Sequence, residues 1–432
     1  MPARVTPARM AAFRVLLAMA RSSTSHCDEL LHGPALDALT PADRNLTTAL
    51  VMGVLRWQLA LDALLAPYLK RKSRLDDEVA IALRMGAWQL LGMDRIPPHA
   101  ALAESVELTK ISGYSSASGM VNAVLRRVAE TRSTTVLQPE NAHPAWMIER
   151  WIRHFGSETA AAVTAYDQQE PEQAIRSGVT TESLASGAFL TRARRVSDGM
   201  IPENARIQDE GSQLVAEIAG RGIRILDSCA APGGKSAILA ENNPNAEITA
   251  VDISRARLDA MRRSFARDPR TAKIQCLLAD ATQLPFRDDA EAVGNFDLIL
   301  CDAPCSGTGT LARNPEIKLR LVLEDLQRQQ QRQIAILRSA YRVLAPGGRL
   351  VYSTCSLEPE ENAAVIETFL QEEPSAQLLD IRERLNAMLA EGALHPAGAE
   401  RLCEHAIRGS YLQTLPGVLP CDGFFASILT RI

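Results

Sequence analysis

The sequence has 432 residues, of which 46% are hydrophobic and 23% are charged, as in ordinary globular proteins. This length predicts two or three domains, and it excludes a small disulfide-bonded scaffold, a collagen-like repeat and a disordered tail protein. The formal net charge of −4 excludes a protein that coats polyanions over its whole surface. Residues 1–150 nevertheless hold 17 Lys and Arg against 14 Asp and Glu, which allows nucleic acid on one face without requiring it.

The cysteines and the apolar runs indicate the cellular compartment of the protein. Eight cysteines are scattered along the chain without a C-x-x-C pair, so the sequence predicts neither a disulfide framework nor a zinc site. Reduced thiols are typical of a cytoplasmic protein. No stretch of about 18 apolar residues lacks a charge, and we therefore expect no membrane-spanning helix.

The N-terminal part is predicted to be helical. Arginines alone supply the charge before the first acidic residue, Asp28, as in a mitochondrial transit peptide, but the helical spacing of Phe13 and Leu16 favours a first amphipathic helix. This is enough chain for a helical bundle with its own core. Within residues 8–131, apolar residues recur at three- and four-residue spacing through 43–68, 76–93, 100–111 and 117–129.

The periodicity changes in the second half of the chain. We expect a linker at 132–143, a short helix from Trp146 to Phe155, and a polar stretch at 157–206 to which we assign no elements. The Gln-rich run 327–333 is expected to be a solvated helix face. An alternation of strand-like runs with helical segments then predicts a doubly wound, mostly parallel sheet. These strand-like runs lie at 223–226, 248–251, 274–278, 296–300 and 350–353.

The first candidate site is a loop of small residues that joins a strand to a helix, from Asp227 to Ser236. In an open α/β sheet, ligands bind at the carboxyl ends of the strands, where glycines let the backbone come close. A phosphate-binding loop agrees with Gly234-Lys235-Ser236, and Asp302 then resembles its magnesium ligand, but Cys229 replaces the first glycine. A dinucleotide site lacks its G-x-G-x-x-G sequence. The third interpretation is an adenosylmethionine site.

Two aspartates at strand ends favour this third interpretation. Asp252 follows the second strand, where its carboxylate can accept both ribose hydroxyls, and Asp280 follows the third strand, where it can accept the adenine amino group. A carboxylate at these positions repels a phosphate but suits a neutral adenosine. A single Asp at a strand end is as often a helix cap, so the argument depends on the ordered series.

Two further motifs each carry a cysteine. Asp302-Ala303-Pro304-Cys305-Ser306-Gly307-Thr308-Gly309 follows the fourth strand, and Ser353-Thr354-Cys355-Ser356 ends the fifth. Cys305 and Cys355 are therefore expected in polar loops at one edge of the sheet. The remaining cysteines are expected to be small buried hydrophobic residues, namely Cys27, Cys229, Cys276, Cys301, Cys403 and Cys421.

Together, the blocks from Asp227 to Cys355 resemble the RNA cytosine-5 methyltransferases of the Sun/NOL family, which pair a Pro-Cys motif with a Thr-Cys-Ser motif. In the front part, the segments 82–91, 97–101 and 121–127 resemble a NusB-like helical domain. The resemblance implies an α/β Rossmann-like, adenosylmethionine-dependent methyltransferase domain preceded by an all-α NusB-like domain. The implied domains are 1–133 (NusB-like), 134–205 (linker and abbreviated RNA-recognition-like subdomain) and 206–432 (methyltransferase).

The resemblance also implies how the residues divide the chemistry. Carbon 5 of cytosine is a poor nucleophile, and a thiolate that adds to carbon 6 makes an enamine that can take the methyl group of S-adenosylmethionine. Cys355 is then the nucleophile, Cys305 helps the product to leave, and Asp302 holds the cytosine edge beside the cofactor. The implied cofactor contacts are Cys229, Ala230, Ala231, Pro232, Gly233, Gly234, Lys235, Asp252, Asp280 and Asp302.

A NusB-like domain joined to this methyltransferase implies a cytosine of small-subunit ribosomal RNA as the substrate. Both cysteines are present, which separates the RNA enzymes from the DNA cytosine-5 methyltransferases, where the Pro-Cys cysteine is the nucleophile. Three alternatives stay open: the same chemistry on tRNA, a non-catalytic RNA-binding assembly factor, and a phosphate-loop ATPase. We expect a monomer that binds RNA, and no DNA, membrane or metal.

The sequence departs from the family in two places. Relatives carry a longer subdomain with an Arg-Val-Asn sequence, whereas here Arg176-Ser177-Gly178 keeps only the arginine. Leu319 stands where relatives often carry tryptophan, which should change packing alone. Two basic runs are candidates for phosphate contacts, although a solvated charged surface explains each at least as well. They are Lys70, Arg71, Lys72 and Arg74, and Arg192, Arg194 and Arg195.

Overall fold

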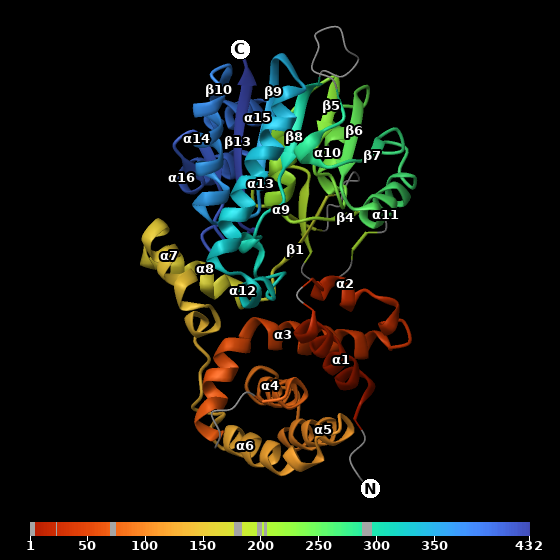
Figure 1. Cartoon of the computed structure of the whole chain (residues 1–432), viewed down its shortest axis with the longest axis vertical. Coiled ribbons are helices and arrows are strands. Elements are labelled where there is room, and N and C mark those ends of the chain that lie inside the picture. Colours follow the sequence, from red (N-terminus) through yellow and green to blue (C-terminus); the bar gives the residue numbers. More distant parts are fainter. Residues whose placement is uncertain are drawn as a thin grey trace. The chain divides into compact units, whose positions relative to one another are not determined.

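The chain forms two compact units in the computed structural model (Figure 1). The helical unit consists of Met1–Glu170 and Leu311–Arg320, and the α/β unit consists of Pro171–Thr310 and Leu321–Ile432. Each unit has its own apolar core. The structure describes residues 5–22, 24–69, 75–176, 184–196, 201–202, 205–286 and 296–432.

The helical unit contains the predicted bundle, which confirms an all-α N-terminal region. The Thr40 hydroxyl begins α3 by accepting a hydrogen bond from the Asp43 amide at 3.1 Å. Leu50 on α3 and Leu83 on α4 are among the fully buried side chains of its core. Its helices are α1 (Pro7–Arg21), α2 (Cys27–Leu31), α3 (Pro41–Leu65), α4 (Asp77–Gly92), α5 (Pro98–Ile111), α6 (Ser118–Thr131), α7 (Ala145–Phe155), α8 (Ser157–Asp167) and α12 (Ile317–Arg320).

The helix α3 is long and apolar enough, with its 3₁₀ extension to Tyr68, to cross a membrane by length and composition. Half of its most apolar window is buried inside the protein, and buried core helices of globular proteins meet the same criterion. Two of its four charged side chains, Arg56 and Asp62, have partners inside the helical unit. Arg56 donates to the Ala312 carbonyl, and Asp62 accepts from Arg84 at 2.7 and 2.8 Å. These contacts are those of a core helix.

The segment Leu311–Arg320 belongs to the helical unit although it comes late in the chain. The Arg56 guanidinium donates to the Ala312 carbonyl from Nε at 3.2 Å and from Nη2 at 2.8 Å. In return, Lys318 Nζ donates to the Arg56 carbonyl at 2.9 Å, and the Lys318 residue is 1% exposed. Leu319, the departure from the family's tryptophan, packs against the apolar core of this unit. The segment is therefore held by backbone acceptors as well as by apolar contacts.

The buried Lys318 should make the stability of this unit depend on pH. Burial lowers the pKa of its ammonium group from 10.5 to about 7, although the Asp167 carboxylate opposes part of the shift. Between these values the unfolded chain binds a proton that the folded chain does not. The free energy of unfolding should therefore rise with pH in this window, by at most about 1.4 kcal/mol per pH unit. Lys318→Met should remove that rise.

Urea unfolding between about pH 7 and about pH 9.5 measures the effect. The four tryptophans all lie within residues 1–170, so their fluorescence reports on the helical unit. Lys110→Met, at an exposed position of α5, is the matched control. Parallel pH curves for the wild type and Lys318→Met would contradict the lowered pKa.

The α/β unit is built on a nine-stranded sheet with the order β11-β12-β13-β9-β8-β5-β6-β7, in which β10 pairs with β13. The strands β9, β8, β5, β6 and β7 are parallel and overlap the five predicted strands, which confirms the Rossmann-like α/β fold. The others are antiparallel to their neighbours. The bounds are β5 (Arg224–Asp227), β6 (Glu247–Asp252), β7 (Gln275–Leu278), β8 (Phe296–Asp302), β9 (Leu344–Thr354), β10 (Ala376–Leu379), β11 (Ile407–Arg408), β12 (Tyr411–Gln413) and β13 (Phe425–Arg431).

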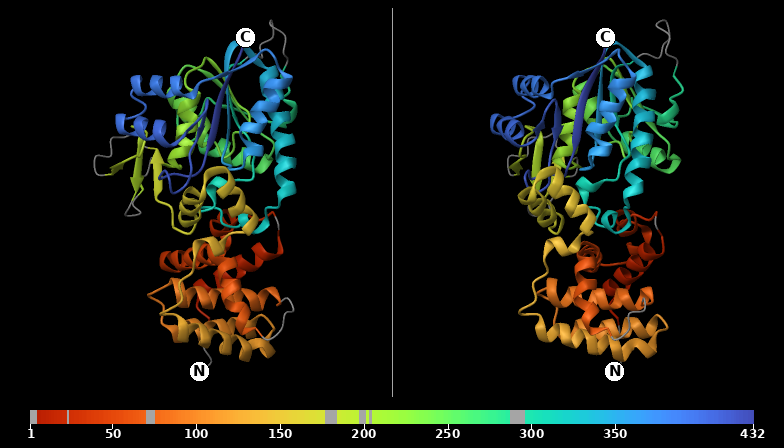
Figure 2. Two further views of the ribbon diagram at one scale, coloured as in Figure 1. Left: turned by 90° about the vertical axis from the view of Figure 1, so that its left-hand side faces the viewer. Right: turned by 60° about the vertical axis from the view of Figure 1, so that its left-hand side comes forward.

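Helices cover both faces of this sheet (Figure 2). Residues of α9, α10, α11, α15 and α16 form one apolar cluster with the sheet, and residues of α13 and α14 form the other. The strand order reverses at β5, so the carboxyl ends of β5 and β8 meet where open sheets bind ligands. The bounds are α9 (Glu210–Ala219), α10 (Gly234–Asn242), α11 (Arg255–Phe265), α13 (Leu323–Arg342), α14 (Ala363–Glu372), α15 (Ile381–Ala390) and α16 (Pro396–His405).

A second, antiparallel sheet forms where the sequence analysis assigned no elements. Its order is β2-β3-β1-β4. Arg176 at the end of β1 is 2% exposed, and its guanidinium pairs with Glu217 at 2.6 Å and with Glu241 at 3.0 Å. The one arginine that this chain keeps from the family motif is thus used inside the α/β unit. The strands are β1 (Gln173–Arg176), β2 (Ala185–Ser186), β3 (Ala193–Val196) and β4 (Arg206–Ile207).

Candidate active site

The loop after β5 turns tightly because its residues are small. Gly233 has a φ of 101°, in the left-handed region that favours glycine, and it precedes the first residue of α10. A Cβ at Gly233 would lie 2.8 Å from side-chain atoms of Met261 and Phe265. The Ala230 amide donates to the Val251 carbonyl at 2.8 Å. The loop is therefore tied to β6 before the chain enters α10.

A cavity of about 120 Å³ lies beside this loop. Two of its lining residues have a buried acceptor without a hydrogen-bond donor among the described residues, at Asp227 Oδ1 and Gln208 Oε1. Burial raises the pKa of Asp227 to about 7, although Ser236 Oγ donates to its other oxygen at 2.6 Å. The cavity therefore suits a ligand that brings donors. The lining residues are Ile207, Gln208, Ser212, Asp227, Cys229, Ala230, Ala231, Pro232, Gly234, Lys235 and Asp302.

The two aspartates predicted at strand ends lie where expected but differ in their surroundings. Asp252, the last residue of β6, is 7% exposed and accepts from the amides of Ala231 at 3.2 Å and Ser254 at 2.8 Å. Asp280 is exposed and begins a 3₁₀ turn, where Oδ1 accepts from the Thr282 amide and hydroxyl. These bonds lower the pKa of Asp280. Asp252 thus braces the first loop, and Asp280 makes the cap that was the alternative explanation.

Lys235 and Asp302 form an ion pair at the end of β8. Lys235 Nζ lies 2.7 Å from Asp302 Oδ2, and Ser353 Oγ donates to Oδ1 at 2.7 Å. The ammonium group also lies 5.1 Å from the centre of the Phe424 ring. Although burial disfavours the ammonium ion, the Asp302 carboxylate raises the pKa of Lys235. Lys235 and Ser353 therefore hold one Asp302 oxygen each.

The two predicted cysteines meet at the ends of neighbouring strands. Cys305 Sγ and Cys355 Sγ are 3.4 Å apart. The contact with the Cys355 thiol, followed by burial, raises the pKa of Cys305. Gly309 ties the two loops together, since its amide donates to the Cys355 carbonyl at 2.9 Å. A Cβ at Gly309 would lie 2.3 Å from the Gly423 carbonyl oxygen, so only glycine fits this approach.

The sequence analysis missed one residue that contacts both cysteine loops, Glu361, and a second, Gln333, that contacts Glu361 and the Cys305 loop. Glu361 is fully buried and accepts from the Ser306 amide, beside Cys305, and from the Ser356 hydroxyl, beside Cys355. Gln333, which was expected on a solvated face, is 0% exposed and donates to Glu361. The solvated-face prediction is thus wrong at this residue, because one face of α13 packs on the sheet.

Comparisons with known proteins agree with this geometry. A family model described as 16S rRNA methyltransferase RsmB/F matches residues 220–430, and one described as the NusB family matches residues 6–130. Ribosomal RNA small subunit methyltransferase B of Xanthomonas campestris is 32% identical over 98% of this chain and 97% of its own. The chain belongs to this family. A probable ribosomal RNA small subunit methyltransferase B of Bacillus subtilis is 30% identical over 90% of each chain.

Membership of the RsmB/F family confirms the resemblance drawn from the motifs. The protein is a ribosomal RNA methyltransferase with an N-terminal NusB-family domain, and it uses S-adenosylmethionine. The solved structure of PH0851 has a TM-score of 0.76 and 20% identity, and it covers 100% of both chains, which shows the same fold. The cofactor fits the first loop, because its ammonium and hydroxyl groups are the donors that Asp227 Oδ1 and Gln208 Oε1 lack.

The two basic runs predicted for phosphate contacts in this RsmB/F-family protein lie outside the cysteine loops. Arg194 and Arg195 are on β3 of the small sheet, and Arg195 pairs with Glu172 at 3.2 Å. The run that contains Lys70, Arg71, Lys72 and Arg74 lies outside the described residues. Within the described ranges, no group of three or more His, Cys, Asp or Glu side chains forms a metal site.

One cysteine prediction is wrong. Cys403 is exposed on α16, whereas Cys27, Cys301 and Cys421 are buried as expected. Cys229 and Cys276 are half-buried. The spacing on α16 explains the difference, since Leu402 takes the buried face next to it.

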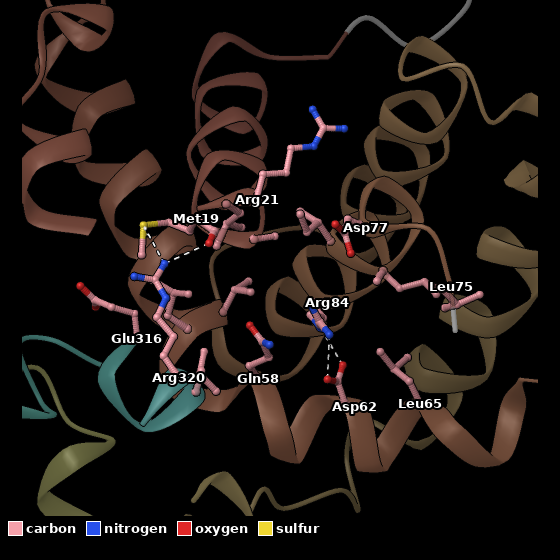
Figure 3. A pocket seen from close by; sticks show the side chains of 18 of the residues that line it. Met19, Arg21, Gln58, Asp62, Leu65, Leu75, Asp77, Arg84, Glu316 and Arg320 are labelled. Carbon is pink, nitrogen blue, oxygen red and sulfur yellow. Dashed lines mark hydrogen bonds and ion pairs between the residues drawn. The ribbon is translucent and has the colours of Figure 1, made fainter. Parts of the chain in front are cut away.

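A larger cavity, of about 780 Å³, lies in the helical unit and contains none of the predicted site residues (Figure 3). Figure 3 shows Arg84 directed at Asp62 and Arg320 directed at Met19. These charged side chains thus already have partners within the unit. The predicted reactive side chains lie instead in the α/β unit, at the two cysteines.

Proposed function

We propose that this protein methylates carbon 5 of a specific cytosine in 16S ribosomal RNA, in the cytoplasm. The observation that carries the proposal is the 3.4 Å separation of the Cys305 and Cys355 sulfur atoms beside the Lys235–Asp302 pair. A binding module does not need two thiols at one strand edge. Methylation at a nitrogen or an oxygen does not need them either, because those atoms are nucleophiles without covalent help.

Cys355 is the nucleophile in this proposal. Its thiolate adds to carbon 6 of the cytosine, which makes carbon 5 an enamine carbon able to attack an electrophile. S-adenosylmethionine supplies that electrophile as its methyl group. Asp302, fixed by Lys235 and Ser353, holds the cytosine edge, and the ammonium group of Lys235 beside it offsets the negative charge that develops on the ring.

Cys305 serves the release of the product. After methylation, the proton on carbon 5 must leave while the bond between carbon 6 and the Cys355 sulfur breaks. Cys305 Sγ lies 3.4 Å from that sulfur and is therefore close to the carbon–sulfur bond that breaks. The pKa of the Cys305 thiol is raised, which makes its thiolate, once formed, a stronger base for this proton.

Most of the residues proposed to contact the cofactor line the cavity beside β5, and Gly233, Asp252 and Asp280 lie outside its lining. Asp252 is proposed for the ribose hydroxyls and Asp280 for the adenine amino group, while Lys235 and Asp302 border the methyl donor. Asp252 has the buried, braced position that such a role requires. The loop residues proposed for the same contact are Cys229, Ala230, Ala231, Pro232, Gly233 and Gly234.

Bisulfite sequencing tests the proposal. Unmodified small-subunit ribosomal RNA and a tRNA pool are incubated together with protein and S-adenosylmethionine. One protected cytosine in the ribosomal RNA is the expected result. Protection in tRNA alone would keep the chemistry and overturn the substrate, whereas methylation without any protected cytosine, seen with labelled cofactor, would overturn the carbon-5 assignment.

The remaining expectations concern the protein as a whole. We propose that it acts as a monomer on RNA, without DNA or a membrane, and that 1–133, 134–205 and 206–432 are its functional segments. Gel filtration with light scattering measures the oligomeric state. Electrophoretic shift with RNA and DNA competitors measures the preference for RNA. A stable dimer or preference for DNA would contradict these expectations.

A further inference from the structure

A single buried carboxylate contacts the loops of both cysteines. Glu361 Oε1 accepts from the Ser306 amide at 2.8 Å, and Oε2 accepts from the Ser306 hydroxyl. The same Oε2 accepts from Ser356 Oγ at 2.5 Å. Ser306 follows Cys305 and Ser356 follows Cys355 in the chain. The residues that flank the two thiols are therefore joined through one side chain.

Glu361 is itself held firmly. It ends the 3₁₀ turn Pro359–Glu361, and its carbonyl accepts from the Tyr352 hydroxyl of β9 at 2.7 Å. Gln333 Nε2 donates both to Glu361 Oε1 at 3.2 Å and to the Pro304 carbonyl at 3.0 Å. Gln333 thus adds a second link between α13, the Cys305 loop and the carboxylate.

Burial of the Glu361 carboxylate lowers the stability of the fold. The residue is 0% exposed, and burial raises the pKa of Glu361 above its ordinary value, although the surrounding hydrogen bonds oppose the shift. The donors that the structure gives it, from Ser306, Ser356 and Gln333, are uncharged. A carboxylate in such a place costs stability relative to an apolar residue of similar size, so packing does not account for it.

We propose that Glu361 is a positioning residue that fixes the separation of the Cys305 and Cys355 thiols by holding Ser306 and Ser356. This inference rests on the proposed function, in which one thiol forms the adduct and the other assists its release. Reacting groups that shift by about 1 Å can lose about a hundredfold in rate. The release step is therefore expected to depend on Glu361, whereas cofactor binding, which uses other loops, is not.

Glu361→Gln tests the proposal with little change in volume. The amide keeps one acceptor but turns the other into a donor that faces the serine hydroxyls. We expect kcat on ribosomal RNA to fall about tenfold to a hundredfold, with KM for S-adenosylmethionine within about twofold of the wild type. Glu367→Gln, an exposed glutamate on α14, is the matched control and should behave as the wild type.

A double-mutant cycle separates positioning from general stability. Ser306→Ala and Ser356→Ala should each lower kcat, and each should add little to Glu361→Gln because they remove the same link. Melting temperatures report the fold of every variant. Additive effects on kcat, or a loss of activity that follows the melting temperature alone, would overturn the proposal.

A readout without RNA makes the inference independent of the substrate. Diamide takes two electrons and two protons from two thiols, which leaves one disulfide, and peptide mapping counts the Cys305–Cys355 product. We expect Glu361→Gln to form it at least about fivefold more slowly than the wild type. Equal rates would overturn the proposal. Slower closure in a protein whose wild type fails to methylate cytosine would retain the positioning role and reject the proposed function.

Discussion

Cys355→Ala is expected to abolish methyl transfer to ribosomal RNA. Without the thiol at the end of β9, no adduct activates carbon 5, so the rate should fall by about 10⁴-fold or more. Incorporation of labelled methyl groups into unmodified RNA measures it. Cys403→Ala removes an exposed thiol on α16 and should retain full activity.

Cys305→Ala is expected to block the last step of the reaction, the release of the product. The nucleophile remains, so the adduct and the methyl transfer can form, but the release step lacks its thiol. A covalent protein–RNA complex should accumulate and appear as a slower band on a denaturing gel, and Cys305→Ala/Cys355→Ala should not form it. A Cys305→Ala variant that turns over normally and traps nothing would contradict the division of roles between the two cysteines.

Asp302→Asn is expected to have the second largest effect. The change keeps the shape and one oxygen that can accept from Ser353, but it removes the negative charge that pairs with Lys235 at 2.7 Å. Loss of the group that orients the reacting ring is expected to lower kcat by about 10²-fold. Single-turnover rates with saturating cofactor measure the loss.

The control and the pH dependence sharpen this prediction. Asp259→Asn changes a partly exposed carboxylate on α11 and should have no effect. Because the Asp302 carboxylate raises the pKa of Lys235, Asp302→Asn should lower that pKa and move any basic limb due to the lysine to lower pH. An unchanged kcat would show that Asp302 serves only to pair with Lys235.

The parts of the site that the sequence predicted are those encoded locally. Each parallel strand contains a short apolar run, because both faces of the sheet are covered, and Asp302 and Cys355 follow such runs. Because β8 and β9 are adjacent and parallel, the residues at their carboxyl ends lie close together. Asp252 and Asp280 could be located in the same way, although the cap at Asp280 could not be separated from a ligand contact.

The residues that the sequence analysis missed depend on contacts between distant segments. Gln333 is polar, but its spacing to Leu337 and Tyr341 follows the buried stripe of α13 and could have identified it. Glu361 has no such signal, since the partners of its carboxylate are 28 or more residues away along the chain, apart from Ser356. Lys318 is a third case, because a lysine is normally expected at the surface.

The division of the helical unit has a consequence for synthesis of the protein. Its first part, Met1–Glu170, leaves the ribosome long before Leu311–Arg320 has been translated. Until then, the Arg56 guanidinium lacks the Ala312 carbonyl, and the Cys27 amide lacks the Glu316 carboxylate that it contacts at 3.1 Å. Domains usually fold in the order in which they emerge. Here the N-terminal unit can be completed only after most of the strands of the other unit have been made.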